Sequence, residues 1–232
     1  MKGRTIVQIV LGVVIVALAV LLYNSIQKPM RFDNEYTKRR DACAEKLKSI
    51  RTLEDAYKVT YGTYCGSFDT LFNRLMNEDS MKVISKVINY EKIPADVDIN
   101  EIPELEAVKQ GYISRAEIYV NPIDELRKKN KLPIVDANGY THQMTNEEIL
   151  NLRYVPYPRG EKNEFELEAG MLDKSGFLVP VFECRVPLTL LLSDMDHQLV
   201  VNKIAEINEV KGRYAGWKVG DMTQAVTDGN FE

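Results

Sequence analysis

The chain has 232 residues, a net charge of −4 and three cysteines. This length suits one domain of generous size or two small ones, and it can bury an apolar core without a metal or a disulfide framework. The mildly acidic balance argues against nucleic acid as a partner, because proteins that bind nucleic acid present clustered positive charge.

Residues 6–23 form the most apolar segment of the chain, and a short basic tail at 1–5 precedes it. Gln8 is the only strongly polar side chain in this segment. As a helix the segment would extend about 27 Å, close to the ~30 Å hydrocarbon thickness of a bilayer. We therefore expect a transmembrane helix. The side chains expected to contact lipid are Ile6, Val7, Ile9, Val10, Leu11, Val13, Val14, Ile15, Val16, Leu18, Val20, Leu21 and Leu22.

A cleaved secretory signal is the alternative to a retained anchor, because Lys2 and Arg4 resemble the basic start of such signals. The apolar run is longer than in most signals, and residues 24–29 lack the small-x-small pattern of a cleavage site. The sequence therefore favours a signal anchor and a single-pass membrane protein. Its sidedness stays open: basic residues after the span favour a cytoplasmic domain, whereas a basic pair before an apolar run is typical of export anchors.

The segment 24–62 follows the span. Pro29 cannot donate a helical hydrogen bond, so we expect a kink or break there and an amphipathic stalk helix that ends at Gly62. An apolar stripe with spacings of three, four and seven runs along this helix. It either packs on the protein's own domain or forms a coiled coil or a contact face for other copies or protein partners. The stripe consists of Tyr36, Cys43, Leu47, Ile50, Leu53, Tyr57 and Tyr61.

Region 63–150 has a mixed α+β pattern. Ser67 is in position to cap the next helix, and Asn138-Gly139 predicts a tight reversal. The expected elements are a helix at 68–76, a strand at 81–90, a helix at 103–108, a strand at 113–120 and a helix at 123–129.

Region 151–232 is richer in strands. We expect strands at 152–157, 164–169 and 178–186, a helix at 194–210 and a strand at 213–220. The whole pattern predicts an α+β fold: a transmembrane helix, a long amphipathic helix, and a mixed domain with a mainly antiparallel sheet in its C-terminal half.

No sequence pattern for catalysis, cofactor binding or metal binding occurs: there is no glycine-rich phosphate loop, no GxSxG and no HExxH. His142 and His197 lack partners at metal-ligand spacing. Cys184 lies in an apolar run and is expected to be a buried thiol rather than part of a Cys184–His197–acid constellation. About 27 Å of helix would separate Cys43 from Cys65, too far for a disulfide. We therefore predict no enzyme and no cofactor.

Three further features have a structural and a functional interpretation. Glu164, Glu166 and Glu168 would share one face of a strand, which favours a solvated face over paired acid and base. Trp217, the only tryptophan, is interpreted as the anchor of a terminal hairpin rather than a platform for a sugar or partner. The cluster 38–40 is interpreted as solvated or facing lipid headgroups.

Two features together resemble type IV pilins and pseudopilins: a short basic head containing Gly3 before an apolar helix, and a proline soon after the span followed by an amphipathic helix. Segment 47–64 is similar to the helix and Gly-x-Tyr loop of that family. The chain departs from the family pattern at Arg4, where Phe or Met is usual, and at Gln8, where a glutamate is usual. The resemblance implies an inner-membrane subunit with a periplasmic domain that packs with copies or partners through its N-terminal helix.

The stretches 64–71, 179–183 and 217–220 look like an uncharacterised family of membrane-anchored bacterial proteins, a resemblance that covers most of the chain and implies no known activity. The leading hypothesis is therefore a structural or scaffolding protein of the bacterial envelope, within a pilus-like or secretion-like assembly. The alternative is a membrane-anchored ligand-binding or sensory domain, which predicts a concave pocket with convergent polar groups in the C-terminal half.

Overall fold

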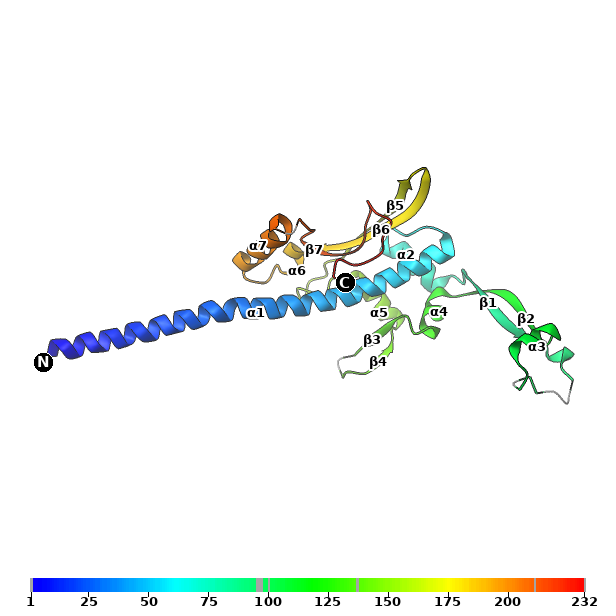
Figure 1. Cartoon of the computed structure of the whole chain (residues 1–232), viewed down its shortest axis with the longest axis horizontal. Coiled ribbons are helices and arrows are strands. Elements are labelled where there is room, and N and C mark those ends of the chain that lie inside the picture. Colours follow the sequence, from blue (N-terminus) through cyan, green and yellow to red (C-terminus); the bar gives the residue numbers. More distant parts are fainter. Residues whose placement is uncertain (1, 95–97, 100, 137, 211, 232) are drawn as a thin grey trace.

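The computed structural model describes residues 2–94, 98–99, 101–136, 138–210 and 212–231, except the side chains of residues 2 and 4–6 (Figure 1). One helix, α1 (Lys2–Tyr61), is the spine of the molecule, and the other elements surround its C-terminal half. The remaining helices are α2 (Phe68–Asn77), α3 (Glu104–Lys109), α4 (Pro122–Lys128), α5 (Asn146–Leu150), α6 (Leu188–Leu191) and α7 (His197–Ala205). Short 3-10 turns lie at Tyr90–Lys92 and Asn151–Arg153, and a π-helical turn at Glu206–Val210 continues α7.

Within the residues that the structure describes, the strands form three antiparallel units. β1 (Met81–Ile88) pairs with β2 (Ile113–Val120), and β3 (Pro133–Val135) pairs with β4 (Thr141–Gln143). In the third unit β6 (Phe177–Pro187) lies between β5 (Glu166–Lys174) and β7 (Gly216–Gly220). The predicted α+β fold, with an antiparallel sheet in the C-terminal half, is confirmed.

The apolar stripe of α1 is the centre of the core. Cys43, Leu47, Ile50 and Leu53 have no exposed surface, while Tyr36 and Tyr61 at the ends of the stripe are half-buried. They pack in one cluster with side chains from α2 and from the sheet, including Leu71, Phe182 and Val219. Burial of each large apolar side chain contributes about 1.5–3 kcal/mol. The stripe therefore packs on its own domain, and the alternative of a coiled-coil or partner face at these residues is wrong.

Helix α1 continues through Pro29 without a break, so the predicted division between a span and a separate stalk helix is wrong (Figure 1). Proline removes one backbone hydrogen bond, but helical turns already formed on both sides continue to propagate. The tail expected before the span also belongs to α1, which begins at Lys2. The end at Gly62 is confirmed: its φ is +80°, and its N–H donates to the Lys58 carbonyl over 2.8 Å.

Several predicted elements have different bounds, and one is absent. Residues 152–157 are not a strand: Asn151–Arg153 is a 3-10 turn, and Tyr154 makes a single bridge to Glu164. Pro156 and Pro158 have no N–H to donate to a ladder, which is the physical reason. The strand expected at 164–169 begins later and runs on to Lys174 as β5.

The other predicted elements occur with small shifts. The helix expected at 194–210 begins at His197, because the Asp196 carboxylate accepts hydrogen bonds from the N–H groups of Gln198 and Leu199. The predicted reversal at Asn138-Gly139 joins β3 to β4, and Gly139 has a φ of +85°.

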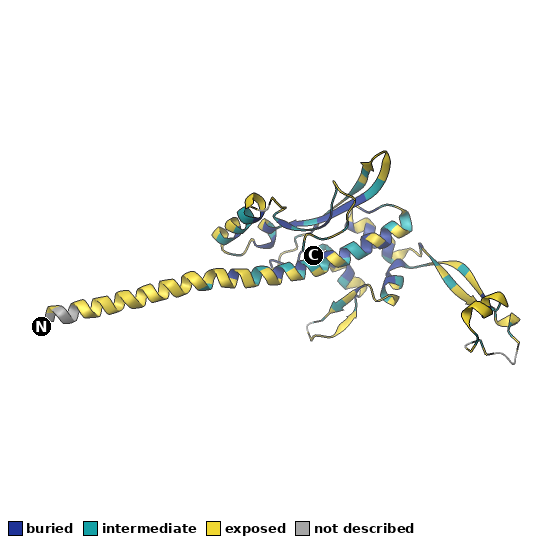
Figure 2. Cartoon of the chain, in the orientation of Figure 1, coloured by how far each residue is buried: buried dark blue, intermediate teal, exposed yellow. Residues whose placement is uncertain are grey.

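The hairpin of β1 and β2 projects from the domain together with α3, at the end far from the N-terminus of α1 (Figure 1). Much of its surface is exposed, as is the N-terminal half of α1 (Figure 2). These two exposed parts lie at opposite ends of the molecule.

Candidate functional site

The N-terminal half of α1 exposes its apolar side chains. From Val7 to Leu22, the large apolar residues expected to contact lipid are between 46% and 66% exposed. The side chain of Ile6 lies outside the described residues. This helix is long and apolar enough to cross a membrane, and no part of its apolar window is buried against the rest of the chain. Each such side chain gains about 1.5–3 kcal/mol on leaving water, so an apolar surrounding would stabilise this surface.

The domain begins to cover α1 at Phe32, which is the first buried residue among those of the helix whose side chains the structure describes. Seven positions later, Arg39 forms an ion pair with Asp194 in the loop before α7, with 2.9 Å between Nη2 and Oδ2. Its Nη1 also donates to the Leu191 carbonyl over 2.9 Å. The interpretation of 38–40 as a solvated cluster is thus wrong for Arg39, which is buried. No sequence pattern identified Asp194 as the partner of Arg39, because 155 positions separate the two residues.

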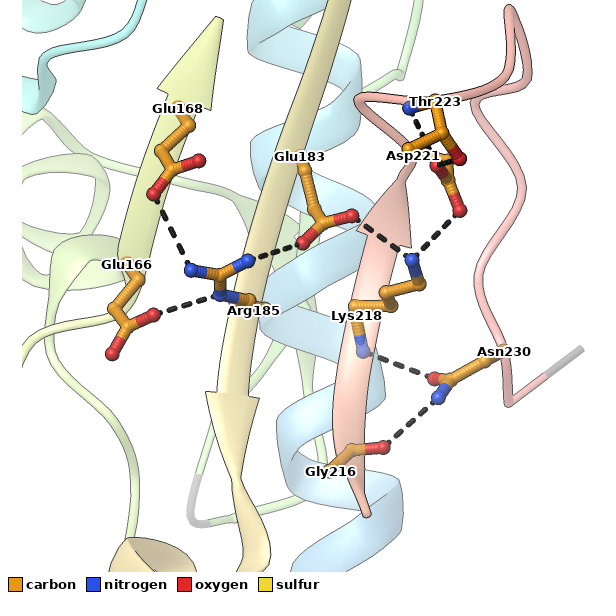
Figure 3. A network of polar contacts seen from close by, with 9 residues as sticks. All are labelled: Glu166, Glu168, Glu183, Arg185, Gly216, Lys218, Asp221, Thr223 and Asn230. Atoms are coloured by element: carbon orange, nitrogen blue, oxygen red, sulfur yellow. Dashed lines mark hydrogen bonds and ion pairs between the residues drawn. The ribbon is translucent and has the colours of Figure 1, made fainter. Parts of the chain in front are cut away.

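A network of ion pairs crosses one face of the sheet of β5, β6 and β7 (Figure 3). Arg185 lies 2.8 Å from carboxylate oxygens of Glu166 and Glu183, and 3.3 Å from one of Glu168. These hydrogen bonds raise the pKa of Arg185. The alternation predicted over 164–169 is confirmed: Glu164, Glu166 and Glu168 are exposed, whereas Phe165 is buried and Leu167 and Ala169 are half-buried.

The network continues to β7 through Lys218, which lies 2.9 Å from Glu183 and 2.8 Å from Asp221 (Figure 3). Burial opposes ionisation of Asp221, but hydrogen bonds from Lys218 and Thr223 outweigh it and lower the pKa to about 2. Every one of these carboxylates has a cationic partner. The cluster therefore joins neighbouring strands and offers no unpaired base for proton transfer.

Glu54 is a buried carboxyl group inside the core, at 0% exposure. Its Oε2 accepts a hydrogen bond from the Cys65 N–H over 2.9 Å, whereas its Oε1 has no partner. Burial raises the pKa of Glu54 to about 8. The sequence analysis missed this residue, although its spacing from Ile50 and Tyr57 places it within the apolar stripe.

All three cysteines are buried free thiols, as expected for Cys184. Burial raises the pKa of Cys43 to about 12 and that of Cys184 well above its usual value. Because the thiolate is the reactive form, these surroundings oppose nucleophilic chemistry. His197 is exposed at the start of α7 while Cys184 is fully buried, so the fold does not assemble the constellation drawn from the sequence.

The two histidines do not form a metal site either. His142, an exposed residue of β4, lies 3.1 Å from the Glu148 carboxylate. Within the described ranges, no group of three or more His, Cys, Asp and Glu side chains is placed to hold a metal ion.

Two concave regions flank α1. A groove of about 770 Å³ lies between α1 and the β3–β4 hairpin, with Ser49, Thr52 and Ile134 in its wall. A smaller cavity of about 230 Å³ lies where α1 meets α7 and β7, and Trp217 is part of its wall. Trp217 contacts the ring of Tyr36, with 5.9 Å between ring centroids, so it anchors the terminal strand against α1.

Comparison with protein-family models, with curated proteins and with solved structures gave no significant match to this chain. The functional argument therefore rests on the geometry of the chain itself.

Proposed function

We propose that the chain is a single-pass membrane protein of the bacterial envelope that acts as a structural or scaffolding component of an assembly. The observation that carries the proposal is the continuity of α1, which is exposed and apolar over 7–22 and becomes the core of the domain from Phe32 onward. One rigid element thus joins the proposed anchor to the domain.

For a chain anchored as proposed, this continuity would set the height of the domain above the membrane. From Tyr23 to Phe32 a helix rises about 14 Å, at roughly 1.5 Å per residue. A flexible linker would leave the domain free to turn, whereas a helix couples its orientation to that of the span. Copies anchored in one membrane would therefore present their domains at the same height.

The hairpin of β1 and β2 supports a role in assembly. Its register places all four charged side chains of the two strands, Lys82, Lys86, Arg115 and Glu117, on one face. The opposite face carries Val83, Val87, Ala116 and Ile118, and both Val87 and Ile118 are 38% exposed. A two-stranded unit alone is only marginally stable in water. An uncharged face on a projecting hairpin is a surface through which such a domain would contact other protein chains.

Carbonate extraction of the full chain from membranes tests the anchor. We expect the wild-type chain to remain in the washed membrane, and a Val14→Arg/Leu18→Arg double variant to be extracted, since each central arginine costs about 2.5–3.5 kcal/mol on insertion. Val59→Arg, at a position that is 74% exposed in the domain, is the control and should stay in the membrane. Mass spectrometry that finds a mature N-terminus near Asn24 would overturn the anchor in favour of a cleaved signal.

Cysteine crosslinking in membranes tests the scaffolding role. The native thiols are buried, so crosslinks would report on an introduced cysteine. We expect Val87→Cys to give crosslinked species and Lys86→Cys, the neighbouring position on the charged face, to give far fewer. Monomer alone from both variants would count against assembly through this hairpin. A C-terminal reporter fusion, expected to be active in the periplasm, tests the sidedness.

The groove beside β3 and β4 favours a second candidate, an anchored ligand-binding or sensory domain. Its volume of about 770 Å³ is within the range of small-molecule sites. Native mass spectrometry of the purified full chain separates the two candidates. A co-purifying small molecule that is lost in Ser49→Trp, but retained in the exposed-site variant Val59→Trp, would support the sensory role.

A further inference from the structure

The cavity of about 230 Å³ between α1, α7 and β7 has a basic and aromatic wall. Its cationic residues come from three separate segments. Among the described residues, no carboxylate lines it. The charged and aromatic lining residues are Arg40, Lys203, Arg213, Tyr36, Tyr214 and Trp217.

The cations of this wall form only weak ion pairs with carboxylates. Lys203 lies 3.0 Å from Glu206, and Arg40 lies 2.8 Å from Asp41, in pairs that are partly exposed. Exposed ion pairs of this kind contribute only about 0.2–1 kcal/mol, so both cations can turn toward a stronger partner. Arg213 forms no ion pair with any residue that the structure describes.

The aromatic part of the wall adds a hydroxyl donor. Tyr36 is half-buried, and burial raises the pKa of its hydroxyl to about 12, even though Arg40 opposes the shift and Asp33 and Glu206 add to it. The hydroxyl therefore stays protonated at neutral pH. It makes no hydrogen bond with any described residue, and the Trp217 indole nitrogen is a buried donor that also lacks a partner. A buried donor without an acceptor, such as this indole N–H, costs about 1–3 kcal/mol. The Tyr36 hydroxyl keeps some exposed surface, so a bound acceptor can reach it.

We propose that this cavity binds a small oxyanion of the size of phosphate, held by Arg213, Lys203 and Arg40 with the Tyr36 hydroxyl as a further donor. Charge-assisted hydrogen bonds of this type are about twice as strong as neutral ones. The volume equals that of roughly seven to eight water molecules, at about 30 Å³ each, which leaves room for the ion and a few waters.

The height of the cavity favours a free ion over a lipid headgroup. Tyr36 follows Tyr23 by 13 positions on one helix, which places it about 20 Å above the apolar segment. The headgroup layer adds only about 5–8 Å on each side of the hydrocarbon. The site is independent of the proposed scaffolding role, and its occupant would bridge α1 to the two C-terminal elements packed beside it.

Tryptophan fluorescence of the full chain in a neutral detergent tests the proposal, because Trp217 is the only tryptophan and lines the cavity. The chain is titrated with inorganic phosphate at constant ionic strength, and calorimetry provides a second measurement. We expect a saturable signal, weakened at least tenfold in Arg213→Gln. Tyr36→Phe keeps the ring and should weaken binding several-fold. Arg159→Gln, which removes the same charge at an exposed position outside the cavity, should bind as the wild type does.

Four results would overturn the proposal, the last of them obtained in lipid nanodiscs. The first is the absence of both a fluorescence change and binding heat, and the second is an Arg213→Gln variant that melts normally and binds phosphate as tightly as the wild type. The third is a signal that chloride reproduces at equal ionic strength. In lipid nanodiscs, a phosphate-independent change with phosphatidylglycerol but not with phosphatidylcholine would assign the site to a headgroup instead. None of these outcomes bears on whether α1 anchors the chain.

Discussion

Arg39 and Asp194, 155 positions apart in the chain, form a two-point ion pair that joins α1 to the loop before α7. Only 6% of Arg39 is exposed, and the Leu191 carbonyl accepts a further hydrogen bond from its guanidinium. The hydrogen bond from Arg39 lowers the pKa of Asp194. α6 and α7 lie on the part of the domain nearest the apolar half of α1 (Figure 1). The ion pair joins α1 to the loop between these two helices.

Removing the carboxylate should loosen this junction. We expect Asp194→Asn to lower the free energy of unfolding by about 1–3 kcal/mol, because the buried guanidinium loses one of its two carboxylate partners and keeps only Glu35, 3.2 Å from its Nε. Urea denaturation of the full chain in detergent measures the loss, and proteolysis should cut first within 188–205. Lys38→Met is the control: Lys38 is exposed and its pair with Glu35 spans 3.9 Å, so the change should be below about 0.5 kcal/mol. Equal stability of Asp194→Asn and wild type would contradict this role.

The buried Glu54 makes stability depend on pH. Its pKa is about 8 in the folded protein and near 4.5 when exposed, so the folded state keeps a proton that the unfolded state has released. The stabilisation that Glu54 gives the folded state is fully present below pH 4.5 and is lost as the pH rises toward 8. We expect the free energy of unfolding to fall by about 1.4 kcal/mol per pH unit in this window from this group alone.

Glu54→Gln should remove this part of the pH dependence, since glutamine mimics the protonated carboxyl at every pH. Melting curves between pH 5 and 8 measure it as the difference in slope between variant and wild type. Glu45→Gln, at an exposed position on the same helix, should keep the wild-type slope. If the stability of wild type and of Glu54→Gln changed with pH at the same slope, the Glu54 carboxyl would not be buried.

Periodic features of the chain could be predicted from the sequence, and pairings between distant side chains could not. The apolar run over 7–22, the stripe from Cys43 to Tyr57 and the end at Gly62 each follow from local patterns. The strand expected at 152–157 does not form, because Pro156 lies within it and Pro158 follows it, and neither has an N–H for a strand ladder. Arg39 and Glu54 were missed because their partners, Asp194 and the Cys65 N–H, come from other segments that only the fold brings close.

Gly220 is a position where the fold requires glycine for two reasons. Its φ is +74°, and a Cβ added there would lie 2.2 Å from the Phe182 carbonyl oxygen on the neighbouring strand. We expect Gly220→Ala to cost about 1–2 kcal/mol for the left-handed backbone and about 1–3 kcal/mol more for overpacking. Gly62→Ala is a matched control, because Gly62 has a φ of +80° but nothing within 4 Å of the added atom. Denaturation midpoints that shift equally in both variants would exclude the close approach at Gly220.

The three native thiols should resist alkylation for as long as the domain is folded. Cys43, Cys65 and Cys184 are all buried, and burial raises the pKa of each, so little thiolate forms at neutral pH. Cys43 and Cys184 have no exposed surface, and only 6% of Cys65 is exposed. We expect iodoacetamide to label none of them in the native full chain and all three in urea, as counted by mass spectrometry. Val59→Cys supplies the positive control, because position 59 is 74% exposed on the last turns of α1 and its thiol should react at once. If Cys184 in the native chain were labelled as fast as the introduced thiol, Cys184 would be exposed to solvent. That result would contradict the packing of the apolar stripe of α1 against β6.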